Sequence, residues 1–436
     1  MRQVTQRRPH HRILALALPA VAICLLALAA PAMAASPAPE AASASPAASA
    51  AASPAAVAAS PAAADASPVP APEPAVLTCD LSRAALVFGG TVTATGTLTP
   101  AAEAQEVVVT IGGAEAGRAF TDAAGAYALT FTPRRNGSVA ASLAADPTVV
   151  SEPQTLEVKP KVSVSRGALI PFLKSRFVVK VAPSAYAGVV TVKVTHRGVV
   201  VGRYRARVRS GRAVLQVPLR GVDGFTLRFT LAARNGLAAR SFQKKVVVRA
   251  RTLAVGSTGL HVKGMLTGLR RLAIRIPGMG SRFTTQVRDS VMAFQKAYRL
   301  PRTYVFNTAN WRKLDRARII RPRYSSPATH IEVDKGRQIL MVVKNGKVHG
   351  LICVSTGATG NTPEGTFRIR TKYPYTTSGF GGILVRTMGF VGNFAIHGYA
   401  PVPPYPASHG CVREPIWVCA WVYGQSWVGE RLYVYH

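Results

Sequence analysis

A 41-residue stretch of alanine, proline and serine divides the chain and excludes a single globular fold. Of residues 35–75, 36 are Ala, Pro or Ser. Recurring prolines prevent a continuous helix and favour an extended, semi-rigid chain. So few large apolar side chains cannot form a packed core. We therefore interpret residues 35–75 as a linker that holds a folded part, beginning near residue 76, away from the N-terminus.

Residues 1–34 have the pattern of an export signal. Four arginines precede an apolar run over residues 13–30, and Ala32-Met33-Ala34 forms a small-x-small cleavage site. An uncleaved membrane anchor is the alternative, because 18 apolar residues reach the lower limit for spanning a bilayer. We expect an exported protein that works in the cell wall, either released or tethered at its N-terminus. No later segment is long and apolar enough to span a membrane.

Two successive regions have the rhythm of small β modules. In residues 76–158, β-branched runs are separated by glycine-containing turns, and residues 159–250 repeat this pattern. This spacing is typical of immunoglobulin-like sandwiches, although no cysteine pair supports the name. The strands that we predict are residues 91–99, 106–111, 127–132, 177–181, 189–195, 213–217, 226–231 and 245–248.

Residues 251–325 change to helical periodicity. Apolar residues spaced by three or four predict one helix near residues 260–272, a second near 287–298 and a short third around Trp311, with Thr284 or Thr285 as a cap. The segment resembles the three-helix peptidoglycan-binding domain often attached to wall enzymes. It departs from that pattern at Leu272-Ala273-Ile274, which has no glycine, and at Pro301-Arg302-Thr303. A simple helical spacer is the alternative.

The large positive charge of the chain is concentrated in its middle. The formal net charge is +35. Residues 159–251 contain 21 basic and one acidic side chain, and residues 252–325 contain 15 basic and two acidic ones. Arg203, Arg205, Arg207 and Arg209 alternate and would project from one face of a strand. The region could bind anionic wall polymers, or it could be an ordinary solvated surface. The absence of interleaved aromatic residues makes nucleic acid an improbable partner.

The C-terminal region, residues 326–436, combines predicted strands with a cysteine and two histidines. Asn345-Gly346 between apolar runs predicts a tight hairpin. His397 ends an apolar strand, and Cys411 follows beyond a proline-rich loop. A thiol attacks an acyl carbon as thiolate, so it needs a base or cation nearby and amides that stabilise the oxyanion. A zinc site is a weaker alternative, because no fourth ligand has metal-binding spacing.

Residues 328–436 resemble the catalytic domain of the L,D-transpeptidases, the YkuD family. The resemblance rests on His397-Gly398, Val354-Ser355-Thr356-Gly357, Thr362-Pro363-Glu364-Gly365-Thr366-Phe367 and Ser408-His409-Gly410-Cys411-Val412-Arg413. It implies a mostly β catalytic fold and a reaction on peptidoglycan stem peptides without a cofactor or metal. Carried over by residue, Cys411 is the nucleophile, His397 transfers the proton, and His409 orients or acts electrostatically. Ser408, Gly410, Gly398 and Arg413 are candidates for contacts with the substrate or the oxyanion.

Three further features belong to this region. The glycine-rich stretch 378–382, preceded by Tyr373 and Tyr375, is a candidate lid, or else a plain surface loop. Cys353 and Cys419 are expected to be buried as small apolar groups. A disulfide between them is the alternative in an oxidising compartment.

The sequence as a whole therefore predicts an exported, mainly β, multidomain transpeptidase. It would form a thioester on Cys411, release D-alanine from a stem peptide, and pass the acyl group to an amine of a neighbouring stem, in cell wall biogenesis. A carboxypeptidase or endopeptidase that passes the acyl group to water has the same chemistry. A non-catalytic wall-binding protein is the alternative from another class.

Overall fold

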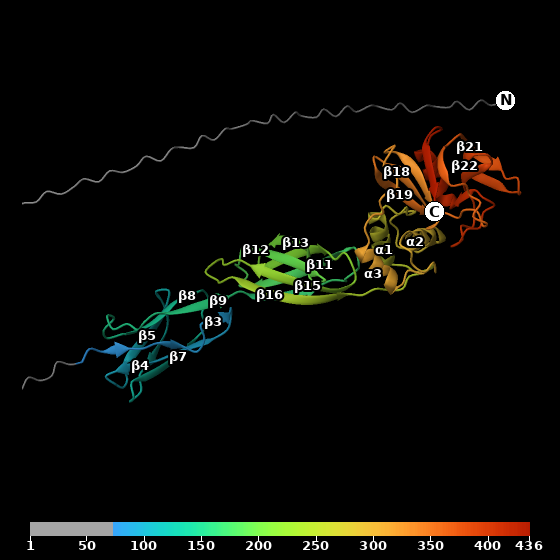
Figure 1. The fold of residues 1–436 in the computed structure, drawn as a ribbon. Coiled ribbons are helices and arrows are strands. Elements are labelled where there is room, and N and C mark those ends of the chain that lie inside the picture. Colours follow the sequence, from blue (N-terminus) through green and yellow to red (C-terminus); the bar gives the residue numbers. More distant parts are fainter. Residues whose placement is uncertain (1–72) are drawn as a thin grey trace, which may run out of the picture. The chain divides into compact units, whose positions relative to one another are not determined.

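The computed structural model describes residues 73–436, so the predicted signal at residues 1–34 and nearly all of the predicted linker lie outside the described residues. The described part is mainly β, as expected, with four helices among residues 73–436 (Figure 1). None of these helices has the length and apolar character needed to cross a membrane.

The first β module consists of two sheets. Strand β4 pairs with β1, β2 and β7, and the second sheet has the order β3-β9-β8-β5-β6. The predicted strands at 91–99, 106–111 and 127–132 correspond to β4, β5 and β7. Alternate residues of β5 are buried, as expected for a strand with one face in a core. The strands are β1 (Val76–Leu77), β2 (Asp80–Leu81), β3 (Ala85–Val87), β4 (Val92–Thr99), β5 (Glu106–Ile111), β6 (Ala114–Phe120), β7 (Ala126–Phe131), β8 (Gly137–Leu143) and β9 (Gln154–Lys159).

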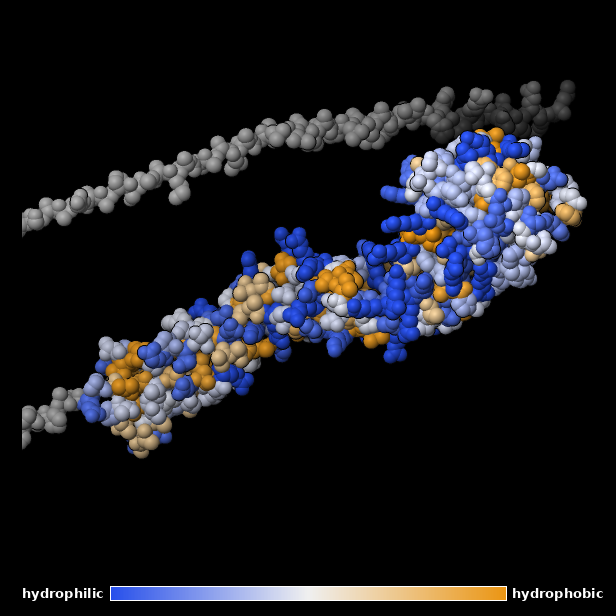
Figure 2. Space-filling model, in the orientation of Figure 1, coloured by the Kyte–Doolittle hydropathy of each residue, from blue (hydrophilic) through white to orange (hydrophobic). Residues whose placement is uncertain are grey.

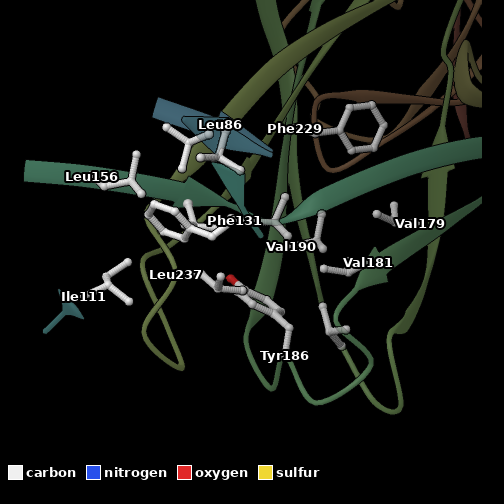
Figure 3. Close-up of a cluster of buried hydrophobic side chains, with 14 of the residues drawn as sticks. Leu86, Ile111, Phe131, Leu156, Val179, Val181, Tyr186, Val190, Phe229 and Leu237 are labelled. Carbon is white, nitrogen blue, oxygen red and sulfur yellow. The ribbon is translucent and has the colours of Figure 1, made fainter. Parts of the chain in front are cut away.

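The second β module also has two sheets, with strand orders β10-β11-β14 and β13-β12-β15-β16. Its buried apolar side chains form one cluster with those of the first module. Figure 3 draws part of this cluster, including Phe131 and Leu156 from the first module and Tyr186 and Val190 from the second. The strands are β10 (Lys161–Arg166), β11 (Lys174–Ala182), β12 (Val189–His196), β13 (Val199–Arg207), β14 (Arg212–Pro218), β15 (Asp223–Leu231) and β16 (Arg240–Val248).

Three of the four predicted arginines share one face of a strand, and the fourth does not. Arg203, Arg205 and Arg207 are exposed on β13, at the edge of its sheet. Strand β13 ends at Arg207, and Arg209 instead forms an isolated bridge with Arg212 at the following turn. The expectation of a single row of four arginines is therefore corrected. Hydrophilic side chains protrude over β12 and β13 in Figure 2.

The three predicted helices are α1 (Leu260–Arg271), α2 (Thr285–Ala297) and α3 (Thr308–Arg316). Thr284 caps α2, because its Oγ accepts a hydrogen bond of 3.3 Å from the Val287 amide. The apolar faces of the helices do not form a core of their own. They pack together with one face of β18 (Ile339–Lys344) and β19 (Lys347–Cys353) from the C-terminal region.

Polar contacts reinforce this shared core. Lys296 of α2 is fully buried, and its Nζ donates to the carbonyl oxygens of Val354 at 2.7 Å and Pro403 at 3.0 Å. Trp417 Nε1 donates to a carboxylate oxygen of Asp289 at 3.1 Å. The helical module and the C-terminal region are thus joined by both apolar and hydrogen-bonded contacts.

The C-terminal region has two sheets with strand orders β19-β18-β17-β25-β20 and β21-β22-β23-β24. A second apolar cluster, distinct from the one shared with the helices, joins these sheets and α4. The predicted hairpin is present, with Asn345 and Gly346 both at positive φ between β18 and β19. The other elements are β17 (His330–Asp334), β20 (Gly365–Arg368), β21 (Thr371–Thr377), β22 (Ile383–Val391), β23 (Phe394–Gly398), β24 (Val412–Glu414), α4 (Ile416–Gln425) and β25 (Arg431–Tyr435).

Candidate active site

Two parallel strands bring the predicted nucleophile and base together. In the pairing of β23 with β24, Ile396 lies opposite Val412, and His397 lies opposite Arg413. Ile396 and Val412 are fully buried in the core. Because side chains alternate along a strand, His397 and Arg413 point away from that core. Cys411 directly precedes β24 and therefore shares their face.

This face opens into a pocket of about 840 Å³. Cys411 and His397 both line it, together with Ser408, His409 and Arg413. Residues 376–381, at the end of β21 and in the turn that leads to β22, also line it. Five of the seven residues predicted for the site therefore line one cavity, although they come from segments on both sides of the proline-rich loop.

Burial keeps both partners neutral near pH 7. His397 is 4% exposed. The pKa of His397 is lowered to about 4, chiefly by burial; the Gly398 backbone acts against this shift, and the Arg413 guanidinium contributes to it. Burial also raises the pKa of the Cys411 thiol, while the Ala395 backbone amide and Arg413 act against this rise. The pocket therefore contains a thiol with a raised pKa and an imidazole with a lowered pKa, and Cys411 Sγ contacts the Asn393 carbonyl oxygen at 3.6 Å.

A network of short hydrogen bonds shapes the loop that carries Cys411. Ser408 is buried, and its Oγ donates to the Cys411 carbonyl oxygen at 2.5 Å and accepts from the Gly410 amide at 3.1 Å. The Thr362 hydroxyl donates to the Gly410 carbonyl oxygen at 2.6 Å, and Asn361 Nδ2 donates to the His409 carbonyl oxygen at 2.9 Å. Ser408 therefore holds the loop, and its predicted contact with the substrate or the oxyanion stays a prediction.

The two predicted glycines have different roles. Gly410 has φ +136°, and a Cβ there would lie 2.5 Å from the Phe394 ring. Its amide already donates to Ser408, so this amide does not serve as an oxyanion donor. Gly398 faces away from the pocket, where a Cβ would lie 2.6 Å from the Cys419 sulfur. The strand alternation turns the α-carbon hydrogens of Gly398 toward α4, and its predicted contact with the substrate or the oxyanion stays a prediction.

His409 lies at the rim of the pocket rather than beside the thiol. Its ring is exposed and stacks on Phe380, with centroids 4.1 Å apart and an angle of 13° between planes. No hydrogen bond joins the His409 ring to another residue of the described part of the chain. The structure places His409 in the pocket wall, and the orienting or electrostatic role that we predict for it stays a prediction.

Phe380 is a site residue that the sequence analysis missed. It is 74% exposed, and it lies in the glycine-rich stretch predicted as a lid. That stretch does line the pocket, whereas Tyr375 does not. The available signal was a large apolar residue between Gly379 and Gly381, within the predicted lid.

Arg413 is held at the back of the site. Its guanidinium lies over the Tyr399 ring at 4.7 Å, and Nη1 donates to the Pro401 carbonyl oxygen at 3.4 Å. Its Nε is buried without a hydrogen-bond partner, and no carboxylate of residues 73–436 forms an ion pair with it. The predicted contact of Arg413 with the substrate or the oxyanion is compatible with this arrangement and stays a prediction.

The remaining cysteines of the region are free thiols. Cys353 and Cys419 are buried, as expected for small apolar groups. Cys353 Sγ contacts the Asp289 carbonyl oxygen at 3.4 Å, and Cys419 Sγ contacts the Ile416 carbonyl oxygen at 3.1 Å. The alternative of a disulfide between them is not realised in this structure.

Comparison with known proteins places this region in a family. The family model described as the L,D-transpeptidase catalytic domain matches residues 328–434. No curated protein matches the chain.

Several solved structures of other proteins are similar to part of this chain. An L,D-transpeptidase of Xylanimonas cellulosilytica is 30% identical, with 43% of this chain and 98% of that chain covered and a TM-score of 0.41. One from Stackebrandtia nassauensis is 21% identical, with 42% and 95% covered and a TM-score of 0.29. One from Enterococcus faecium is 26% identical, with 25% and 50% covered and a TM-score of 0.22. Residues 328–434, which carry His397 and Cys411, belong to the L,D-transpeptidase catalytic-domain family.

Proposed function

We propose that this protein is a peptidoglycan L,D-transpeptidase in which Cys411 is the nucleophile and His397 is the base. One observation supports this most strongly: both side chains project from neighbouring strands into one pocket, within the region that matches the family. The chemistry of the family assigns a peptidoglycan stem peptide to that pocket. The extracytoplasmic location that this substrate requires agrees with the predicted export signal.

In the first half-reaction, the Cys411 thiol loses its proton to His397 as the sulfur attacks the carbonyl carbon at the L-centre of the third stem residue. A new C–S bond forms and the carbonyl oxygen becomes an oxyanion. The amides of His409 and Cys411 are the candidate donors to this oxyanion. The C–N bond then breaks, and the departing D-alanine amine takes the proton from His397. The product is a thioester on Cys411.

In the second half-reaction, an amine of a neighbouring stem attacks the thioester carbon. His397 accepts a proton from this amine, a C–N bond forms, and the C–S bond breaks. The thiolate regains a proton from His397, so the enzyme returns to its starting state. A pocket wall that excludes water favours the amine over hydrolysis, and the turn bearing Phe380 is in position to form that wall.

The experiment that tests this function compares the protein with a Cys411→Ala variant. Each is incubated with a tetrapeptide stem donor and a stem amine acceptor, and the products are identified by mass spectrometry. We expect a joined product and free D-alanine from the unaltered protein, and neither from the variant. Cys79→Ala is the matched control, because this buried cysteine lies in the first β module. It is expected to retain activity.

The two alternatives give different results in the same experiment. Free D-alanine with only a shortened tripeptide would identify a carboxypeptidase. The absence of any Cys411-dependent product would identify a non-catalytic wall-binding protein and overturn the proposal.

The exposed arginines of β13 support a second part of the proposal, that the basic region 159–325 binds anionic wall polymers. Lys193 lies opposite both Arg203 and Arg228 in the sheet, so three like charges are neighbours. Such a row is unfavourable unless a polyanion offsets it. Binding of the protein to purified wall material should weaken as salt rises, since exposed charges are screened. Binding that is independent of salt would contradict this part.

A further inference from the structure

A second pocket lies between the helical module and the catalytic region, and its lining is strongly basic. Its volume is about 690 Å³, within the range of small-ligand sites, roughly 300–1,000 Å³. Its arginines come from three separate segments: the turn after α2, the connection from α3 to β17, and the turn from β17 to β18. None of its lining residues belongs to the pocket that contains Cys411.

Five arginines meet in this pocket, and Asp334 is the one acidic side chain among its lining residues. The arginines are Arg299, Arg302, Arg321, Arg323 and Arg337. Only Arg337 is neutralised there, through an ion pair of 2.5 Å between its Nη1 and Asp334 Oδ2. The convergence of so many guanidinium groups is unfavourable unless a bound anion offsets their repulsion.

Hydrogen bonds outside the pocket hold the backbone that surrounds it. The Arg323 and Tyr324 amides donate to the Glu332 carboxylate at 3.0 and 2.9 Å. Tyr298 donates its hydroxyl to the Arg318 carbonyl oxygen at 2.7 Å. The segment that carries Arg321 is therefore fixed against both the helical module and the catalytic sheet.

Two of the arginine side chains are also held in place. Arg302 Nη1 donates to the Pro404 carbonyl oxygen at 2.5 Å and Nη2 to the Arg337 carbonyl oxygen at 3.3 Å. The Arg323 guanidinium lies 4.6 Å from the centre of the Tyr435 ring, and its Nη1 donates to the His436 carbonyl oxygen at 3.2 Å. Such pre-arrangement reduces the entropy lost when a ligand binds.

The other three arginines of the pocket retain N–H donors that can contact a ligand. Arg299 and Arg321 are exposed, and neither forms an ion pair within residues 73–436. Arg337 Nε is buried without a hydrogen-bond partner. Guanidinium groups present donors in a planar fork that matches the oxygens of phosphate, and several of them together favour a ligand of more than one negative charge.

We propose that this pocket binds a ligand bearing phosphate groups, such as one or a few units of a phosphodiester. Arg299 and Arg321 make the direct contacts, whereas Arg302 and Arg323 shape the walls. Arg302 also joins the pocket to Pro404, in the loop that leads to Cys411. The proposal is independent of the transpeptidase reaction, since it needs neither Cys411 nor His397.

The test measures binding of the full chain to a fluorescent glycerol-phosphate oligomer at low salt. We expect the double variant Arg299→Ala/Arg321→Ala to lose at least about tenfold in affinity, because two charge-assisted contacts are removed. Lys347→Ala/Arg370→Ala is the matched control. It removes two exposed positive charges from the catalytic region, outside both pockets. We expect its affinity to change less than twofold.

Competitors identify the source of the phosphate. Displacement by pyrophosphate would indicate a small phosphate compound, displacement by unlabelled oligomer alone a polymer, and displacement by phosphatidylglycerol vesicles a lipid headgroup. Each of these supports a phosphate site. The proposal is overturned if the oligomer does not bind, if both double variants lose affinity equally, or if the carboxylate polymer polygalacturonate competes as well as the phosphate probes. Circular dichroism of both variants verifies that they are folded.

Discussion

At the scale of single residues, burial is the main influence on the two proposed catalytic groups. It lowers the pKa of His397 and raises that of Cys411. A stable thiolate–imidazolium pair requires the opposite, a cysteine pKa below that of the histidine. In the proposed reaction, we therefore expect proton transfer to accompany the attack on the substrate instead of preceding it. Arg413 is the charged side chain that lowers the pKa of the Cys411 thiol and also that of the His397 imidazole.

Replacing Arg413 by methionine tests this electrostatic role. The guanidinium lowers the pKa of Cys411, so its removal should raise that pKa further. Alkylation of Cys411 by iodoacetamide, followed across pH by mass spectrometry of its peptide, should become a few-fold slower near pH 8. Its pH profile should shift toward alkaline values. The exposed Arg370→Met serves as control, and an unchanged profile in Arg413→Met would refute the role.

Glu414 provides a prediction on stability. Its carboxylate is fully buried without a hydrogen-bond partner, and burial raises its pKa to about 8. In the unfolded chain a glutamate titrates near 4.3, so between these values the unfolded state alone is charged. The folded state is thus favoured at low pH, and stability falls as pH rises toward 8, by about 1.4 kcal/mol per pH unit.

Glu414→Gln removes this titration. As the pH rises from about 5 to about 8, the unaltered protein should progressively lose thermal stability relative to the variant. Above about pH 8, the difference in stability between the two should stay constant. Melting temperatures measured in parallel across this window test the expectation. The exposed Glu103→Gln should follow the unaltered protein. Equal pH dependence of Glu414→Gln and the unaltered protein would show that the carboxylate is not kept neutral.

At the scale of elements, the loop before β24 is held in shape by the segment from Ser355 to Thr362, through backbone bridges and a side-chain hydrogen bond. Ser355 forms an antiparallel bridge with Arg413, and Gly357 forms a parallel one with Ser408. These contacts fix both ends of the turn that presents Cys411. The turn therefore depends on a segment about 50 residues earlier in the chain, as well as on its own sequence.

Gly410→Ala should disable this turn. The backbone is in the left-handed region, and the new Cβ would be too close to the Phe394 ring. We expect transpeptidation to fall by at least about tenfold, with a loss of stability of roughly 1–3 kcal/mol. Gly429→Ala is the matched control, since Gly429 also has positive φ, at +97°, but has open space at its Cβ. It should lose stability but keep activity; equal activity in both variants would contradict the expectation.

At the scale of the whole molecule, the helical module and the catalytic region share a core. Met341, Val343 and Leu351 of the catalytic sheet are buried against the helices. Separating the two parts would expose a contiguous apolar surface, which promotes aggregation. The boundary predicted near residue 325 marks a change in sequence pattern, and we expect the parts on its two sides to fold as one unit.

Two fragments test this arrangement. We expect residues 326–436 alone to aggregate or to unfold without a cooperative transition, and residues 251–436 to be monomeric with one cooperative transition. Size-exclusion chromatography and thermal denaturation distinguish the two. A monomeric, cooperatively folded 326–436 fragment would show that the shared core is dispensable.

Local patterns predicted much of the secondary structure and the proposed catalytic pair. Alternation identified β4, β5 and β12, helical periodicity identified α2 with its cap at Thr284, and Asn345-Gly346 identified a hairpin. Strands with weaker alternation were missed, among them β6, most of whose residues are exposed or half-buried. Phe380 escaped notice because its role depends on stacking with His409, which lies 29 positions away.

The sequence by itself determined the chemistry available to this protein: a cysteine and a histidine in family motifs, β-rich modules, and a positive charge concentrated in residues 159–325. These properties depend on residue type and on short spacings, which local physics governs. Only the tertiary structure decided that Gly398 faces the core, that burial holds Cys411 and His397 neutral, and that five arginines from three segments meet in one pocket. Burial and proximity between distant segments arise from packing, and packing is a property of the whole folded chain.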